Sequence, residues 1–115
     1  PAKLEAALVM KPEISQVMVY GDKRPWLSAV VVPASENKSD NAVFEDISRC
    51  IAEVNQTLSK SEKIRRFLIA DAPFSVENAL LTPTMKVRRL AVVDAYQAQL
   101  DELYRKKSKH EQGRK

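Results

Sequence analysis

The chain has 115 residues, of which 44% are hydrophobic and 30% charged, and this balance favours one globular domain over a disordered segment. Its single cysteine excludes an intrachain disulfide, and no apolar run approaches the ~20 residues that a membrane-spanning helix requires. The formal net charge of +4 is uneven, because residues 105–115 carry +5 and residues 1–104 carry −1.

The first third of the chain predicts one helix and two strands. Residues 2–10 carry apolar side chains at helical spacing, and Pro12 ends this helix. The runs 14–20 and 26–32 are rich in β-branched residues and are separated by the turn-forming sequence GDKRP. Because each run is apolar over consecutive residues, we expect an antiparallel pair with both faces covered.

The rest of the chain predicts a helix, a strand, a long connection and a second helix. Apolar residues recur every three or four positions over 43–58, an apolar strand follows over 64–70, and a C-terminal stripe runs over 93–104. The resulting order is α-β-β-α-β-loop-α. We therefore expect an α+β domain, with a small three-stranded, mostly antiparallel sheet flanked by helices.

Several single residues have ordinary structural explanations. Cys50 falls on the apolar face of its helix, and Trp26 is expected in the core or at a domain interface. One cysteine and one histidine, His110, do not make a zinc site, so no metal ligand is predicted. The cluster of Lys60, Lys63, Arg65 and Arg66 is expected at a solvated sheet edge, and contact with the phosphates of a ligand or of nucleic acid is its alternative role.

The tail, residues 105–115, is expected to be solvated, and contact with nucleic acid or an anionic membrane surface is its alternative role. No secretory h-region is evident, so a soluble, cytoplasmic protein with optional peripheral membrane contact is the default. Because the chain begins at Pro1 and not at Met, we also expect it to be a piece of a longer protein.

The connection 71–86 is the unusual element. Connections of more than roughly 12–15 residues are mostly functional or disordered, and this one is stiffened by prolines and carries apolar anchors. It delivers Lys86, followed by Arg88 and Arg89, to the start of the last helix. A helix N-terminus disfavours cations, so this placement needs a reason.

One reason is an anion-binding site for a phosphate or carboxylate, with Lys86 as its centre beside unpaired helix N–H groups. Thr82 and Thr84 would add hydroxyl contacts, although Thr84 is expected first of all as the helix N-cap. The alternative is that these are ordinary surface cations, which cost a helix only about 0.3–1 kcal/mol.

At this connection the sequence resembles the C-terminal domain of AMP-forming acyl-CoA synthetases, in the adenylate-forming superfamily, and within them the long-chain fatty-acid CoA ligases. Their last core motif reads approximately Leu-Thr-Pro-Thr-x-Lys-x-x-Arg, which matches residues 81–89, and PFSVENALLTPT over 73–84 resembles its lead-in. Residues 1–8, 16–33 and 62–75 also resemble the family's first helix, strand pair and last strand. Ala79 departs from the pattern, because the family has glycine there.

The resemblance implies that residues 1–104 are a mobile C-terminal lid domain that starts after the hinge motif of a larger enzyme. Such an enzyme uses Mg²⁺, ATP and a fatty acid to form an acyl-adenylate, and CoA then displaces AMP. Lys86 is implied as the catalytic adenylation lysine. Arg89 matches the motif arginine, a supporting residue that contacts the loop or the large domain, and Arg88 is left solvated. After rotation, another face of the domain would help to form the CoA channel.

The implied partners are the large N-terminal adenylation domain of the same chain and the substrates, without specific nucleic acid. The fragment alone is expected to be monomeric and inactive. Two alternatives stay open: a basic α+β module that binds nucleic acid, and a scaffold of the same family that has lost catalysis. The first lacks the aromatic pairs and the Gly-x-x-Gly clamp expected of RNA-binding sheets.

Overall fold

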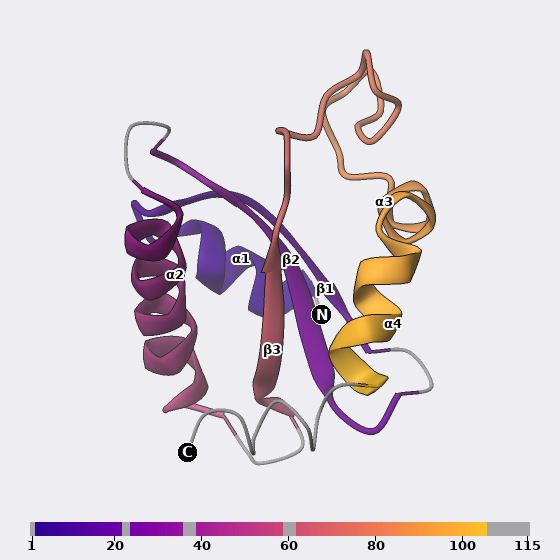
Figure 1. Cartoon of the computed structure of the whole chain (residues 1–115). Coiled ribbons are helices and arrows are strands. Elements are labelled where there is room, and N and C mark those ends of the chain that lie inside the picture. The colour runs from indigo at the N-terminus through magenta and orange to yellow at the C-terminus, as the bar shows by residue number, and fades with distance from the viewer. Residues whose placement is uncertain (1, 22–23, 36–38, 59–61, 106–115) are drawn as a thin grey trace.

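The computed structural model describes residues 2–21, 24–35, 39–58 and 62–105. Four helices and three strands lie along these residues (Figure 1). In chain order they are α1 (Ala2–Val9), β1 (Ile14–Tyr20), β2 (Leu27–Pro33), α2 (Asp40–Asn55), β3 (Ile64–Ile69), α3 (Arg89–Ala95) and α4 (Gln97–Arg105). The predicted α+β class and order of elements are confirmed.

The three strands form one mixed sheet in the order β1-β2-β3. β1 and β2 pair antiparallel, with Val17 opposite Val31, as the short turn between them predicts. β3 pairs parallel to β2, with Val30 opposite Leu68, so only one of the two strand pairs is antiparallel. The parallel pairing follows from α2, because a helical crossover returns the chain to the end of the sheet where β2 began.

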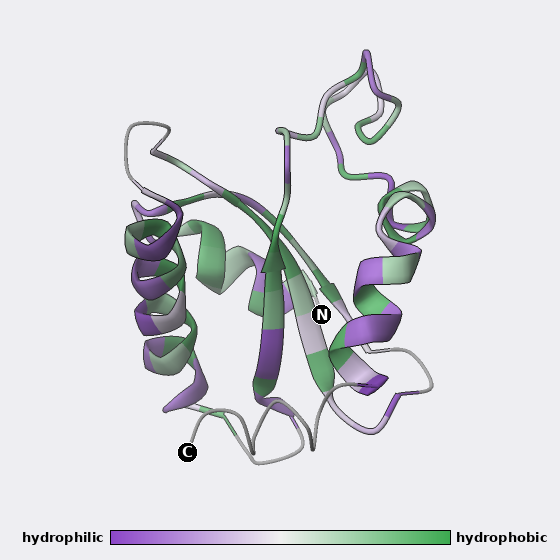
Figure 2. Ribbon diagram, in the orientation of Figure 1, coloured by the Kyte–Doolittle hydropathy of each residue, from purple (hydrophilic) through white to green (hydrophobic). Residues whose placement is uncertain are grey.

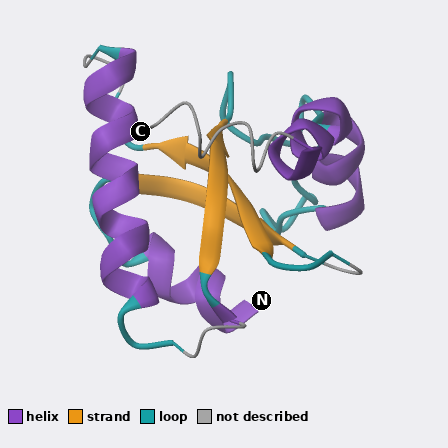
Figure 3. Cartoon of the chain, turned by 60° about the horizontal axis from the view of Figure 1, so that its bottom comes forward, coloured by secondary structure: helices purple, strands orange, loops and turns teal. Residues whose placement is uncertain are grey.

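Each face of the sheet has its own core, and helices cover both faces (Figure 3). Leu4 and Leu8 of α1 and Ile47 and Ile51 of α2 pack on the face formed by alternate residues such as Val17. The intervening strand residues, including Met18 and Val30, face the second core, with Phe74, Leu80 and Leu81 of the connection, Val92 of α3 and Leu100 of α4. Figure 2 shows the hydrophobic sides of the helices turned toward the sheet.

The predicted C-terminal helix is divided into α3 and α4 at Tyr96. Tyr96 has φ −113° and ψ 19°, outside the helical range, and its ring is buried. Its hydroxyl donates to Asp71 Oδ1 at 2.8 Å, which joins the start of the connection to α3. Val92 of α3 and Leu100 of α4 both pack in the second core.

The single residues singled out above lie largely as expected. Cys50 is 1% exposed, and Trp26 is buried and stacks on Tyr104 with ring centroids 4.2 Å apart. Arg65 is exposed on the edge strand β3, whereas Arg66 is half-buried with its guanidinium 5.8 Å from the Trp26 ring. Lys60 and His110 lie outside the described residues.

Candidate functional site

The motif segment forms a narrow hairpin, residues 81–87, that we call the lysine ribbon. Leu81 and Val87 form an isolated antiparallel bridge, and the Thr82 N–H donates to the Lys86 carbonyl at 2.8 Å. The Met85 N–H donates to the Thr82 carbonyl at 2.8 Å, which closes a tight turn. The ribbon lies in the part of the chain that projects beyond the sheet, above α3 in Figure 1.

The residues of the turn explain its shape. Pro83 occupies the second position of the turn, where its restricted φ is already correct, and Met85 follows in the left-handed region with φ 69°. A turn closed by a left-handed residue is a common three-residue hairpin loop. The sequence therefore builds a stiff tip from local chemistry, although methionine replaces the glycine that such a position favours.

The two threonines stabilise this turn. Thr82 Oγ1 accepts from the Lys86 N–H at 3.1 Å and lies 3.0 Å from Thr84 Oγ1. Thr84 is not the N-cap of the last helix, because the chain turns back at Pro83 and α3 starts only at Arg89, with Arg88 as its N-cap residue. Direct contact of either hydroxyl with a ligand stays a prediction.

Lys86 lies on the returning arm of the ribbon, three residues before α3 begins, so the expectation that it sits at the helix start is wrong. Its side chain is exposed, and it makes no hydrogen bond or ion pair with any residue that the structure describes. The ribbon therefore presents an uncommitted ammonium group to the solvent. Met85 and Val87, which flank it, are also exposed, at 65% and 37%.

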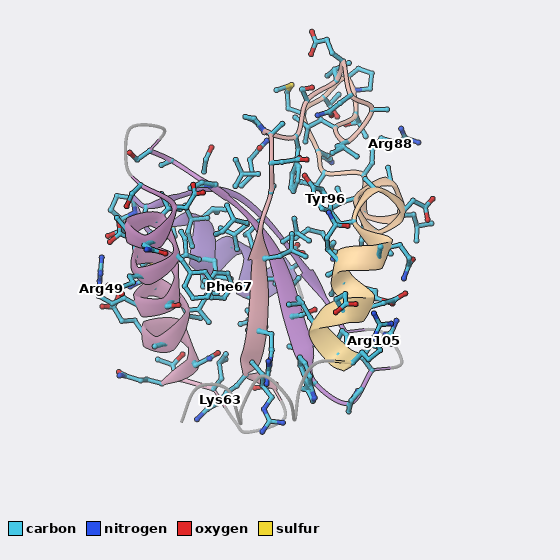
Figure 4. All side chains as sticks on the ribbon, viewed as in Figure 1. Arg49, Lys63, Phe67, Arg88, Tyr96 and Arg105 are labelled. Atoms are coloured by element: carbon cyan, nitrogen blue, oxygen red, sulfur yellow. The ribbon has the colours of Figure 1, made fainter. Side chains whose placement is uncertain are left out.

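Arg88 is exposed, but its side chain is also hydrogen-bonded within the connection, contrary to the expectation that it is only solvated. Its Nη1 donates to the Ala79 carbonyl at 2.8 Å, and its N–H donates to the Leu80 carbonyl at 2.8 Å. Figure 4 shows Arg88 beside the ribbon, above α3. Ala79 has φ 67°, so the position at which the related motif carries glycine does adopt the left-handed conformation.

Arg89 contacts its own domain and not the ribbon. Its Nη1 donates to the Val19 carbonyl at 2.7 Å, and its Nη2 pairs with Glu5 Oε1 at 2.9 Å. The other oxygen of Glu5 accepts from the Val19 N–H at 2.7 Å. We call these three residues the Arg89 clamp, and it joins α1, β1 and the start of α3.

A second attachment holds the beginning of the connection to the same strand. The Gln16 side chain donates to the Phe74 carbonyl at 3.1 Å and accepts from the Phe74 N–H at 2.8 Å. Sequence reasoning missed both Gln16 and Glu5. Each lies far along the chain from its partner, 58 residues for Gln16 and 84 for Glu5, and no local pattern marks either.

Two further observations concern ligands and membranes. No group of three or more histidine, cysteine or acidic residues is arranged to hold a metal ion within the described ranges. No helix in this part of the chain is long and apolar enough to cross a membrane.

Comparison with known proteins gives the class to which this fold and ribbon belong. Residues 1–108 match the family model of the AMP-binding enzyme C-terminal domain, and the chain belongs to this family. The resemblance noted in the sequence is thereby confirmed.

Individual relatives differ in the acceptor of the acyl group. The chain is 34% identical to a chloroplastic long-chain-fatty-acid–[acyl-carrier-protein] ligase of Arabidopsis thaliana, over 90% of this chain and 15% of that protein. It is 28% identical to the long-chain-fatty-acid–CoA ligase FadD15 of Mycobacterium tuberculosis, over 92% of this chain and 21% of that protein. The chain thus spans about a fifth or less of these curated relatives.

Among solved structures, the A-PCP didomain of carboxylic acid reductase from Segniliparus rugosus, in complex with AMP, is similar with a TM-score of 0.83. The identity is 32%, and the match covers 97% of this chain and 17% of that one. The crystal structure of Brucella canis acyl-CoA synthetase has the same fold, with a TM-score of 0.58 and 21% identity.

Proposed function

We propose that this domain is the mobile lid of an AMP-forming, long-chain fatty-acid CoA ligase, and that Lys86 is its adenylation lysine. In the first step, a fatty-acid carboxylate oxygen attacks the α-phosphorus of ATP, and pyrophosphate leaves. In the second step, the thiol of CoA attacks the acyl carbon, AMP leaves with the electron pair of the C–O bond, and the thiol proton passes to solvent. The observation that carries the proposal is the exposed ammonium of Lys86, without a partner among the described residues, on a stiff ribbon.

The chemistry of the first step needs a cation of this kind. Two anions, the carboxylate and the α-phosphate, must approach each other, and negative charge accumulates where they meet. A lysine that is already paired inside its own domain would have to break that pair first. Lys86 is instead available, and closure of the lid would exclude water and strengthen its interaction with both anions.

The second step requires Lys86 to withdraw, because the acceptor thiol must reach the acyl group. A lysine on a mobile domain can be present for one step and absent for the next. We propose that another face of the domain then shapes the CoA channel. An acyl-carrier-protein thiol is the competing acceptor, because one relative is named for that substrate. The role of Lys86 is the same in both cases.

Magnesium has no site of its own in this proposal. Within the described residues no cluster of histidine, cysteine or acidic side chains fits a metal ion, so Mg²⁺ would enter with ATP at the large domain. The residues of this chain contribute charge and position to the reaction, and Lys86 would act on the two anions directly.

We further propose that the enzyme is cytoplasmic, with peripheral membrane contact as an option, and that the 115 residues alone are monomeric and inactive. The acyl pocket and the ATP site would belong to the large adenylation domain. The rival function, nucleic-acid binding, can be tested by a salt titration of binding. Specific binding that survives deletion of residues 105–115 would favour that rival.

The decisive experiment replaces Lys86 by Ala in the parent enzyme, the longer protein that contains this domain. Release of pyrophosphate from fatty acid and ATP measures the first step, and thioester formation from supplied acyl-adenylate measures the second. We expect the first rate to fall by about 10²–10³-fold, as for loss of one transition-state donor, with the second nearly unchanged. Lys3→Ala, at an exposed lysine of α1, is the matched control. Equal rates for Lys86→Ala and wild type in both steps would contradict the proposal.

A further inference from the structure

The lysine ribbon depends on its base for its orientation. Residues 82–87 form the tip of the ribbon and extend beyond the buried anchors Leu80 and Leu81. Most of this tip is exposed to solvent. Within the tip, the hydrogen bonds described above connect only neighbouring parts of the hairpin. Its direction relative to the sheet is therefore set at its base, by the packing of Leu80 and Leu81 in the core and by the polar attachments on either side.

On the N-terminal side of the ribbon, the side chain of Gln16 in β1 holds Phe74 through two hydrogen bonds. On the C-terminal side of the ribbon, the guanidinium of Arg89 is bound to the Val19 carbonyl of the same strand and to the Glu5 carboxylate of α1. Lys86 is three residues from Arg89, so an extended chain places their Cα atoms at most about 10 Å apart. The Arg89 clamp is the long-range polar attachment nearest to the lysine on that side.

The two-sided bonding of the Arg89 clamp fixes the orientation of the guanidinium as well as its distance from β1 and α1. A guanidinium is planar, and its two terminal nitrogens donate here to acceptors on two different elements. Glu5 also uses both carboxylate oxygens, one on Arg89 and one on the Val19 N–H. Replacement of either residue by a group with a single bonding site would remove one of these connections.

We propose that Arg89 and Glu5 are positioning residues that orient the lysine ribbon, and with it Lys86, against the sheet. The catalytic meaning of this orientation rests on the proposed function. Neither residue is proposed to touch the substrate. A partly exposed ion pair adds little to the stability of a domain, so its loss should leave the fold intact. A displacement of about 1 Å at a reacting group, in contrast, can lower a rate by about 10²-fold.

The first test uses the 115-residue chain. Backbone residual dipolar couplings would be measured for wild type, Arg89→Gln and Glu5→Gln, with Arg49→Gln as the control. Arg49 also forms ion pairs, with Glu13 and Asp46, and points outward from α2 (Figure 4). We expect the couplings of residues 82–87 to depart from the orientation of the sheet in the first two variants only. Couplings that fit the wild-type orientation in Arg89→Gln would overturn the proposal.

The second test measures the same variants in the parent enzyme beside Lys86→Ala. We expect the kcat of adenylation to fall by about 10–100-fold in Arg89→Gln, with the KM for ATP nearly constant and the thioester step unchanged. Arg89→Lys should recover only part of the rate, because one ammonium does not reproduce the two-sided fork. A normal adenylation rate in Arg89→Gln, while Lys86→Ala is impaired, would refute the positioning role. If Lys86→Ala is harmless but the couplings respond, the proposed function fails and the orienting clamp stands.

Discussion

Replacement of Ala79 by Gly tests the backbone of the connection directly. Ala79 has φ 67°, in the region where the Cβ of an L-residue meets the following carbonyl oxygen. Its side chain is exposed, so removal of the methyl group takes little packing with it. The N–H of Ala79 donates to Val76 and its carbonyl accepts from Arg88, and both bonds are available to glycine.

The expected change is a net stabilisation. Relief of the left-handed strain should contribute about 1–2 kcal/mol, since that is the cost of this conformation for an L-residue. Glycine also increases the conformational entropy of the unfolded chain, which costs about 0.4–1 kcal/mol. With the midpoints of these two ranges, the free energy of unfolding should rise by about 0.8 kcal/mol.

Urea unfolding of the 115-residue chain measures this change, with the fluorescence of Trp26 as the signal. Trp26 is the single tryptophan, is 6% exposed and stacks on Tyr104, so its emission reports loss of the core. With an m-value of about 1.5–2 kcal/mol/M, the midpoint should rise by roughly 0.3–0.6 M. Ala52→Gly is the control of opposite sign, because an exposed position inside α2 should lose about 1 kcal/mol. A urea midpoint for Ala79→Gly at or below the wild-type value would refute the inference that residue 79 adopts a strained left-handed conformation.

Three other predictions concern the core. Tyr104→Phe should lower the free energy of unfolding by about 1–2 kcal/mol, because the hydroxyl that donates to the Trp26 carbonyl at 2.7 Å is lost while the ring remains; the same urea titration checks this. Burial raises the pKa of Tyr104, so at alkaline pH the folded state holds the phenol proton more tightly than the unfolded state. The free energy of unfolding should therefore fall as the pH rises from about 10, and urea midpoints at successive pH values would measure this. Burial also raises the pKa of the Cys50 thiol to about 11, and Ellman's reagent at pH 8 should react more than about 100-fold more slowly with the folded chain than with the chain in urea.

The elements of the fold were predictable where one local pattern dominates. α2 repeats apolar residues at helical spacing, and β1 and β2 are β-branched runs on either side of a turn. The mixed character of the sheet was less accessible, because a strand's own residues do not specify the direction of its neighbour. The division of the last helix at Tyr96 depends on its long-range bond to Asp71, which periodicity does not record.

The residues of the candidate site were also predictable only where a local motif marks them. The Thr-Pro-Thr sequence is compatible with both a helix start and a turn, and Thr84 was assigned to the wrong one. The turn forms because Pro83 restricts its own φ and Met85 closes the hairpin in the left-handed region. Its motif is enough to propose a role for Lys86, whereas Glu5 is 84 residues from Arg89 and becomes recognisable only when the fold joins α1 to α3.

The contacts of the three cations explain why Lys86, Arg88 and Arg89 occur together near a helix start. Arg88 donates to the Ala79 carbonyl, and Arg89 donates to the Val19 carbonyl and pairs with Glu5, so both guanidiniums have acceptors that offset an unfavourable helix dipole. Lys86 alone of the three has no such partner among the described residues. The two arginines are thus bonded at the base of the ribbon, whereas the lysine is exposed near its tip. This division fits the proposed role of Lys86, because two anchored charges would hold the geometry of the ribbon while the available charge meets an anion.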